Sequence, residues 1–310
     1  MLRVRADHSV ARARRRRGVP PGVSSAGSLR VVEFVELTDG AQLATWTVPG
    51  PELDANRPAV ILVHGGPGLW DYLEPLGALL ADLSTVHRYD QRGCGRSSAS
   101  EELTMERFVA DLEELRIAFG HERVVVLGHS FGATLALAYA GTHPDRVAGL
   151  GYLDGTGIGD WRTASRAEAA RRRAPWAERF AALDGRERTR AEETEWRRIQ
   201  WASDYADPVA GYDLARGMAE APHQINHAAN RSLMAFGDAD QIAWAAAARC
   251  AIAFVHGTAD PRPAENVVAL AGYAHRPRKR IVSDAGHLPW VEQPEQVREI
   301  LHEIVLTAQP

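Results

Sequence analysis

The sequence predicts an α/β fold, in which helices cover both faces of a mostly parallel sheet and a helical segment is inserted before the last strands. Short apolar runs, typical of strands buried on both faces, alternate with helical stretches along most of the chain. The alternation stops between about residues 155 and 240, where Arg, Glu, Ala and Trp are abundant, and then resumes. With 310 residues, the chain is long enough to bury a substantial core in one large domain.

The first part of the predicted core spans residues 29–154. It opens with strands at 31–37 and 43–48, joined by the hairpin turn Thr38-Asp39-Gly40. A helix should begin after the capping residue Thr104 and end at Gly120. Further strands are predicted at residues 59–63, 84–89, 123–127 and 147–153, and a second helix at 133–140.

Residues 155–240 form the predicted helical insertion, which we call the cap. Residues 241–310 complete the core, with strands at 251–255 and 280–282 and a helix at 264–271 between them. A final amphipathic helix is predicted at 294–306. Residues 1–28 hold five arginines between positions 12 and 17 and no apolar segment of a secretory signal. We expect a disordered basic tail or a start codon assigned too far upstream, rather than an arm for an acidic partner.

The composition excludes several classes of protein. Hydrophobic residues make up 45% of the chain, charged residues 25%, and the net charge of −4 offers no basic surface for nucleic acid. No apolar run is long enough to span a membrane. The two cysteines, Cys94 and Cys250, are too few for a disulfide framework and indicate a cytoplasmic protein. We therefore expect a small-molecule substrate as the partner, and the composition leaves the oligomeric state open.

The pentapeptide Gly128-His129-Ser130-Phe131-Gly132 lies between a predicted strand and a predicted helix. In this setting the chain reverses so sharply that the serine takes a strained backbone conformation, with its hydroxyl exposed above the sheet. The glycines on either side permit close backbone contacts that a Cβ would block. The sequence therefore predicts that Ser130 is a nucleophile.

A serine hydroxyl needs a general base, which a carboxylate in turn orients. His287 follows a predicted strand near the C-terminus and is the candidate base. Asp260 follows the strand at 251–255 and Asp154 follows the strand at 147–153, so either carboxylate could reach the same edge of the sheet. The short loop that carries Asp260 immediately precedes the unit that carries His287, and this favours Asp260 over Asp154.

Acyl transfer also needs donors for the oxyanion that develops in the transition state. The N–H of Phe131, the residue after the nucleophile, is one candidate. The loop His64-Gly65-Gly66-Pro67-Gly68 should supply the other from Gly66, with Gly65 as the second choice. For His64 itself we expect a structural hydrogen bond that braces this loop.

Other chemistries find no support in the sequence. The glycine loop lacks the Lys and hydroxyl residue of a phosphate cradle, and Pro67 interrupts any dinucleotide pattern. Cys94 has no base beside it, and no metal-ligand spacing is present. We therefore expect neither metal nor cofactor, and we interpret residues 90–97 as a support loop held by Asp90 and Arg92.

Together these motifs resemble the α/β-hydrolase superfamily, and within it the proline iminopeptidase-like branch of serine peptidases. The resemblance covers about residues 31–306. The matching pieces are residues 64–68, Asp90-Gln91-Arg92-Gly93-x-Gly95-x-Ser97, residues 128–132, residues 135–140 with His143-Pro144, residues 257–260, and Gly286-His287. The resemblance implies an α/β-hydrolase fold with a cap, no cofactor, and hydrolysis of an ester or amide through an acyl-enzyme.

The cap departs from this resemblance. Proline iminopeptidases receive the substrate's amino group in an acidic E-N-H-Y-F-like segment, whereas residues 224–229 here have Ile225 in place of the Glu and alanines in place of the aromatic pair. An acid could come from elsewhere in the cap, at Glu192, Glu193, Glu195 or Glu220. Trp161, Trp196 and Trp201 are candidate substrate-binding residues, with helix packing as the alternative for each.

The first hypothesis is therefore a serine hydrolase of small esters or amides, including an aminopeptidase variant. A thioesterase, lactonase or cyclase dedicated to specialised metabolism would use the same triad and is the second. A non-catalytic ligand-binding protein of this fold is the third, and the intact set of Ser130, Asp260 and His287 argues against it.

Overall fold

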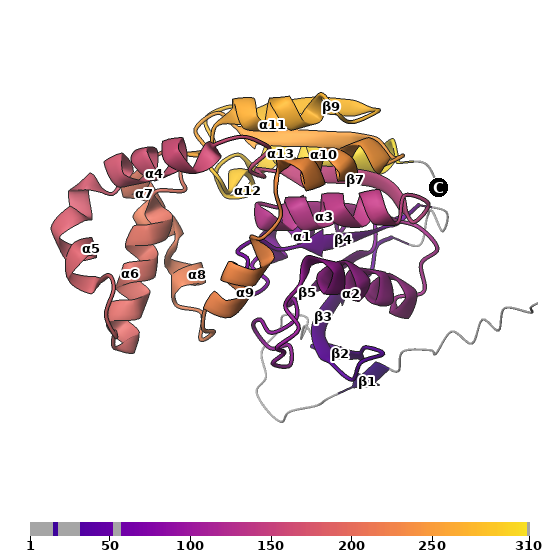
Figure 1. The fold of residues 1–310 in the computed structure, drawn as a ribbon, viewed down its shortest axis with the longest axis horizontal. Coiled ribbons are helices and arrows are strands. Elements are labelled where there is room, and N and C mark those ends of the chain that lie inside the picture. Colours follow the sequence, from indigo (N-terminus) through magenta and orange to yellow (C-terminus); the bar gives the residue numbers. More distant parts are fainter. Residues whose placement is uncertain (1–14, 18–31, 52–56, 309–310) are drawn as a thin grey trace, which may run out of the picture.

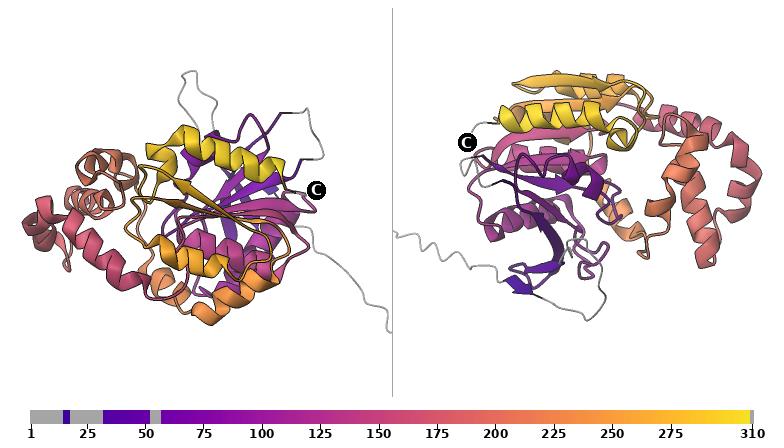
Figure 2. Two further views of the ribbon diagram at one scale, coloured as in Figure 1. Left: turned by 90° about the horizontal axis from the view of Figure 1, so that it is seen from above. Right: turned by 180° about the vertical axis from the view of Figure 1, so that it is seen from behind.

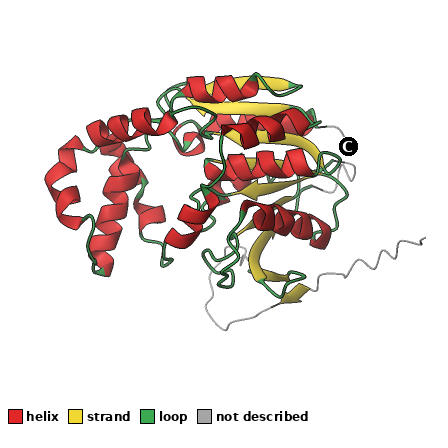
Figure 3. Ribbon diagram, in the orientation of Figure 1, coloured by secondary structure: helices red, strands yellow, loops and turns green. Residues whose placement is uncertain are grey.

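The computed structural model describes residues 15–17, 32–51 and 57–308, and over these residues the strands form one sheet (Figures 1 and 3). Its strand order is β1-β2-β3-β5-β4-β6-β7-β8-β9. The pairs β1–β2, β2–β3 and β3–β5 are antiparallel, and all the others are parallel. The predicted mostly parallel sheet is therefore confirmed. The strands are β1 (Arg15–Arg17), β2 (Glu33–Glu36), β3 (Gln42–Val48), β4 (Ala59–Val63), β5 (Val86–Tyr89), β6 (Val124–His129), β7 (Val147–Leu153), β8 (Ile252–Gly257) and β9 (Pro277–Val282).

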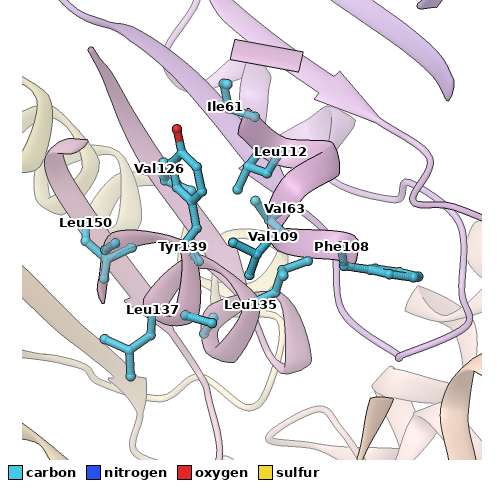
Figure 4. Packing of buried hydrophobic residues seen from close by; sticks show 14 of the residues in the cluster. Ile61, Val63, Phe108, Val109, Leu112, Val126, Leu135, Leu137, Tyr139 and Leu150 are labelled. Atoms are coloured by element: carbon cyan, nitrogen blue, oxygen red, sulfur yellow. The ribbon is translucent and has the colours of Figure 1, made fainter. Parts of the chain in front are cut away.

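Helices cover both faces of this sheet (Figure 2). The core helices are α1 (Glu74–Ala78), α2 (Met105–Ala118), α3 (Phe131–Thr142), α10 (Asp238–Ala247), α11 (Ala264–Ala271), α12 (Pro289–Glu292) and α13 (Pro294–Leu306). Ile61 and Val126 pack into the cluster that holds α2, α3, α10 and α11, and Figure 4 shows part of it. Their strand neighbours Val60 and Val125 pack with α1, α12 and α13 on the other face. This alternation explains why the central strands are apolar throughout.

The chain between β7 and β8 is helical, and its helices α4 to α8 extend away from the sheet (Figure 1). The helices of the cap are α4 (Trp161–Arg172), η1 (Ala174–Trp176), α5 (Ala177–Leu183), α6 (Arg190–Ala202), α7 (Pro208–Leu214), α8 (Arg216–Ala219) and α9 (His227–Leu233). The helix α10 spans the predicted boundary at residue 240 and packs against α3, where Gly141 leaves room for the backbone of Trp244. The domain boundaries at residues 155 and 240 stay predictions.

Several predicted elements have the bounds that the structure shows, among them β4, β7, α11 and α13. Others differ at their starts. The helix α3 begins at Phe131, directly after Ser130, and β9 begins at Pro277 instead of residue 280. The first residues of β9 are only partly covered because it is an edge strand, and their basic side chains hide the strand pattern in the sequence. The short helices α1 and α12 and the helix α10 were not predicted.

The carboxyl ends of the parallel strands lie in register at one edge. Val63 pairs with Gly128, His129 pairs with Leu153, and Leu153 pairs with Val255. The residues that follow these strands therefore meet at this edge, where open α/β sheets place their ligands.

The predicted tail, residues 1–28, lies outside the described residues except for the backbone of β1. Cys94 and Cys250 are both free thiols and buried. Each helix of the described chain is too short or too polar to cross a membrane.

Candidate active site

Ser130 occupies the sharp turn between β6 and α3. Its φ of 58° and ψ of −124° are strained for a residue with a side chain. A Cβ on Gly128 would collide with the backbone of Gly132, and a Cβ on Gly132 would collide with the carbonyl of Val63. Only glycine fits at both positions, and the strand and helix can therefore approach closely enough to present the serine at the sheet edge.

His287 and Asp260 come from the loops after β9 and β8. The Nδ1 of His287 lies 2.7 Å from Oδ2 of Asp260, whose side chain is fully buried. Burial alone would raise the pKa of Asp260, but the charges of His287 and Arg262 outweigh it and hold that pKa below its ordinary value. Asp260 is therefore a carboxylate that accepts the Nδ1–H of His287, and Nε2 of the imidazole has no hydrogen bond within the described part of the chain.

Asp154, the alternative acid, lies beside Asp260 and not on the imidazole. Its Oδ1 accepts the N–H of Gly257 at 2.8 Å, and its Oδ2 has no hydrogen-bond partner among the described residues. Complete burial and the charge of Asp260 raise the pKa of Asp154 well above its ordinary value. Both effects favour the protonated form of Asp154, which lies behind the carboxylate of Asp260.

Ser130 and His287 line one cavity of about 130 Å³ between the sheet edge and the cap. An engineered cavity of about 150 Å³ holds benzene, so this cavity has room for an acyl group of similar size. The core supplies Gly66, Leu69, Tyr72, His129, Ser130, Arg262, His287 and Leu288 to its lining, and the cap supplies Gln200, Trp201, Asp204, Tyr205, Ala215 and Met218.

The two glycines offered as oxyanion donors differ in their surroundings. The N–H of Gly65 already donates to the hydroxyl of Tyr72 at 2.9 Å. Gly66, with φ of 132°, lines the cavity, and the structure shows no hydrogen bond from its N–H within the described residues. Phe131 is the first residue of α3, so its N–H has no partner within that helix. Of the predicted donors, Gly66 and Phe131 are thus available and Gly65 is not.

The sequence analysis did not predict the hydrogen bonds of Tyr72 and His129, which connect the glycine loop at residues 64–68 to the loop of His287. We call these two residues the link. The Nε2–H of His129 donates to the carbonyl of His287 at 2.7 Å, and Nδ1 receives the hydroxyl of Tyr72 at 2.6 Å. Burial and the neighbouring His287 lower the pKa of His129 well below its ordinary value, so the ring is neutral, as this pattern requires. The link joins the glycine loop to the loop of His287.

The structure shows the contacts of His64, predicted to brace the glycine loop, and of Asp90 and Arg92, predicted to hold the support loop at residues 90–97. His64 accepts the N–H of Gln91 at 3.0 Å through Nε2, and burial lowers its pKa, so the ring stays neutral. Asp90 accepts the backbone N–H groups of Asp71 and Arg96. Arg92 pairs with Asp111 and Asp39 rather than with Asp90.

Only one of the three tryptophans proposed for substrate binding reaches the cavity. Trp201, at the end of α6, lines it. Trp196, on the same helix, stacks on Phe180 and donates its Nε1–H to Asp184. Trp161 begins α4, where the guanidinium of Arg162 lies over its ring, and it does not line the cavity. Trp161 and Trp196 therefore contact neighbouring side chains of the cap, and neither is placed to bind a substrate in this cavity.

The four candidate glutamates of the cap, Glu192, Glu193, Glu195 and Glu220, also lie outside this cavity. Three of them pair with arginines of the cap: Glu192 with Arg186, Glu193 with Arg188 and Arg197, and Glu195 with Arg179. Glu220 is exposed and does not line the cavity. The one acid in the lining is Asp204, which sequence reasoning did not single out, and the guanidinium of Arg262 lies 2.7 Å from it.

The segment at residues 224–229, where proline iminopeptidases have an acidic motif, is bound to the core loops instead. Asn226 donates its backbone N–H to Gly68 and its side-chain amide to Gly93. Asn230, one turn later, donates to the carbonyl of Pro67. These contacts fix the glycine loop beneath the cap and give this segment a structural role.

One cluster has the composition of a metal site. Asp154, His256 and Asp260 each bring a ligand atom within 4.8 Å of the others. Asp260 already contacts His287 and the guanidinium of Arg262, while burial favours the protonated form of Asp154. A protonated carboxyl group beside a carboxylate that is already paired is a poor set of ligands for a metal ion. The thiol of Cys94 is no nucleophile either, because burial raises its pKa to about 12.

The fold and the arrangement of these loops are those of an α/β-hydrolase. Residues 58–294 match the family described as alpha/beta hydrolase fold, and the chain belongs to this family. The resemblance found in the sequence is thereby confirmed.

Among individual proteins, the chain is 46% identical over 94 residues to the proline iminopeptidase of Neisseria gonorrhoeae, a match that spans 29% of the chain and 30% of the relative. The match thus covers less than a third of that curated relative. Two solved structures extend over most of the chain. A proline iminopeptidase-related protein of Thermus thermophilus is 25% identical, with a TM-score of 0.67, over 90% of this chain and 98% of that one. A thermophilic esterase of Thermogutta terrifontis is 27% identical, with a TM-score of 0.57, over 89% and 97%.

Proposed function

We propose that this protein is a serine hydrolase that cleaves a small ester or amide through an acyl-enzyme on Ser130. One observation carries the proposal: a strained serine and a His287–Asp260 pair open onto the same cavity. In the reaction, Nε2 of His287 takes the proton of the Ser130 hydroxyl as Oγ attacks the carbonyl carbon, and then returns the proton to the leaving group. Water repeats the sequence on the acyl-enzyme and regenerates the serine.

Asp260 supports this step by holding the Nδ1–H of His287 and stabilising the imidazolium that forms. The N–H groups of Gly66 and Phe131 are the proposed donors to the oxyanion. Removal of one such donor in other hydrolases lowers kcat by about 10²–10³. The acyl group would occupy the cavity beside Trp201 and Met218.

We further propose that the enzyme prefers small uncharged acyl groups to N-terminal prolyl groups. A neighbouring cation weakens the attraction of a carboxylate for a substrate ammonium, and Asp204 in this cavity is already paired with Arg262. The curated relatives include proline iminopeptidases and the similar structures include an esterase, so both classes of substrate enter the test.

A fluorophosphonate probe, followed by peptide mass spectrometry, tests the mechanism. We expect a single adduct on Ser130, which disappears in Ser130→Ala and is strongly reduced in His287→Ala. Hydrolysis of a short p-nitrophenyl ester should fall about 10⁴-fold or more in both variants. An adduct on another residue, or an active Ser130→Ala enzyme, rejects the proposal.

The preference is tested by comparing kcat/KM for p-nitrophenyl butyrate and proline p-nitroanilide, each corrected for its uncatalysed hydrolysis. We expect the ester to be favoured. Efficient release of proline, lost when one cap glutamate is replaced by Gln, would restore the aminopeptidase interpretation.

A further inference from the structure

We propose that Asp204, in the cap segment that follows α6, is a positioning residue of the triad, which holds Arg262 partly away from Asp260 so that Asp260 can serve His287. The inference rests on the proposed function of the site. It assigns the cap a part in the chemistry as well as in substrate choice.

The first support is the backbone of the cap segment at residues 203–206, which is bound directly to the loop of His287. The N–H of His287 donates to the carbonyl of Asp204 at 2.6 Å. A Cβ on Gly286 would collide with that same carbonyl, so the glycine beside the base is required by the cap. Glu292 accepts the N–H of Ala206 with one carboxylate oxygen and the N–H of Gly286 with the other, at 2.8 and 2.7 Å.

The same segment is also bound to the loop of Asp260. The buried Arg172 of α4 donates to the carbonyls of Ser203 and Tyr205 and, through Nη2, to the carbonyl of Ala259 at 2.7 Å. The cap segment therefore contacts both loops that carry the acid and the base. A displacement of this segment would move both of them.

The side chains add a charge relationship to these backbone contacts. Nη1 of Arg262 lies 2.7 Å from Oδ1 of Asp204 and 3.3 Å from Oδ1 of Asp260. The other oxygen of Asp260 holds His287 at 2.7 Å. One guanidinium is thus shared between a cap carboxylate and the catalytic carboxylate, and its shorter contact is to the cap.

The sharing matters because the charges of Arg262 and His287 both act on the one carboxylate of Asp260. If Asp204 lost its charge, Arg262 would pair with Asp260 alone, and the protonated form of the imidazole would be less favoured. If Arg262 lost its charge, two carboxylates would act on the imidazole without compensation, and its protonated form would be more favoured. The other charged or titratable groups packed around Asp204, Arg262, Asp260 and His287 remain unchanged in both cases: Tyr72, His129 of β6, Asp154 after β7, Arg172 of α4, the adjacent Arg173, Tyr205, His256 of β8 and Glu292 of α12.

The acyl site contacts the same segment. Gln200, Trp201, Asp204 and Tyr205, all at or just after the end of α6, line the cavity that Ser130 opens onto. An acyl group bound there would therefore contact the residues that hold the acid and the base in place.

The experiment measures the pH dependence of kcat/KM for p-nitrophenyl butyrate in Asp204→Asn, Arg262→Gln and the double variant. Asp204→Asn keeps the backbone carbonyl that binds His287 and removes only the charge. The acid limb is the part of the profile in which kcat/KM falls as the pH is lowered. We expect the acid limb of Asp204→Asn to move to lower pH by about 0.5–1 unit. The acid limb of Arg262→Gln should move to higher pH by a similar amount. In the double variant the limb should return to within about 0.3 unit of the wild type, because both charges are gone.

A cap ion pair away from the cavity gives the matched control. Arg179→Gln and Glu195→Gln remove the exposed pair on α5 and α6 and should leave the acid limb unmoved. Shifts of the same sign in the two test variants, or limbs that do not move, overturn the inference. Circular dichroism at 25 °C and fluorophosphonate labelling of Ser130 confirm that each variant is folded, and a variant that fails either check is replaced by Asp204→Ser or Arg262→Met, which also remove the charge. If Ser130→Ala retains activity, the proposed function fails instead, and this outcome is separate from the pH profiles.

Discussion

The hydroxyl of Tyr72 and Nδ1 of His129 lie 2.6 Å apart, and this contact joins two loops of the site through the residue that precedes the nucleophile. On one side the hydroxyl receives the N–H of Gly65, and on the other the imidazole donates to the carbonyl of His287. The glycine loop and the loop of the base are thus held by one chain of hydrogen bonds.

Tyr72→Phe breaks this chain without changing the shape of the ring. The N–H of Gly65 and Nδ1 of His129 both lose their partner, which costs about 1–3 kcal/mol for each buried group left unpaired. We expect kcat for a short ester to fall about 10-fold, with a smaller change in KM, because the proposed oxyanion donor at Gly66 loses its fixed position. Tyr273→Phe, at an exposed tyrosine, is the control. A kcat within twofold of the wild type would show that the link is not needed for catalysis.

The two buried aspartates should respond differently to the same substitution. Asp260→Asn leaves His287 with an amide that cannot stabilise the imidazolium, so we expect kcat to fall about 10³–10⁴-fold. Burial favours the protonated, uncharged form of Asp154, and an amide of the same shape is also uncharged, so Asp154→Asn should lower kcat less than about 10-fold. Steady-state kinetics on one ester measures kcat for both variants. The reverse ranking would assign the catalytic role to Asp154.

The raised pKa of Asp154 also predicts an effect on stability with a definite sign. A carboxyl group whose pKa is higher in the folded state takes up a proton on folding, so the folded state loses stability as the pH rises above the unfolded value of about 3.9. Asparagine does not ionise, so a protein with Asn at position 154 does not lose this stability as the pH rises. We expect Asp154→Asn to raise Tm at pH 7–8 by a few degrees, at about 1.5 °C for each kcal/mol in a chain of 310 residues. Differential scanning calorimetry at pH 4 should show a smaller difference in Tm between Asp154→Asn and the wild type. A Tm difference that is constant with pH would contradict the raised pKa of Asp154.

The elements whose contacts are local could be predicted from the sequence alone. The turn at Ser130 depends on Gly128 and Gly132 a few residues away, and those glycines are visible as a motif. The apolar runs of β4 and β7 predict their own bounds because both strand faces are buried. Asp260 and His287 follow strands, and parallel strands in register bring such residues together.

The parts that could not be predicted depend on how distant segments pack. Trp196 and Trp201 lie on the same amphipathic helix, yet one packs against Phe180 and the other faces the cavity. No periodicity tells which face of a cap helix is turned toward the core. Asp204 and Arg262 are 58 residues apart and belong to no motif, so their pairing appears only in three dimensions.

The size of the cavity leads to a prediction about acyl chain length. Met218 of α8 contributes to the lining of a space of about 130 Å³, so Met218→Ala should enlarge it toward the cap. Each methylene of substrate that gains a place in an apolar pocket contributes about 1–3 kcal/mol to kcat/KM. We expect the ratio of kcat/KM for p-nitrophenyl hexanoate over acetate to rise about 10-fold in this variant. Val209→Ala, on the exposed surface of α7, removes apolar volume from the cap without touching the cavity and should leave the ratio unchanged. An unchanged ratio in Met218→Ala, with Ser130 still labelled by the phosphonate, would place the acyl group elsewhere than in this cavity.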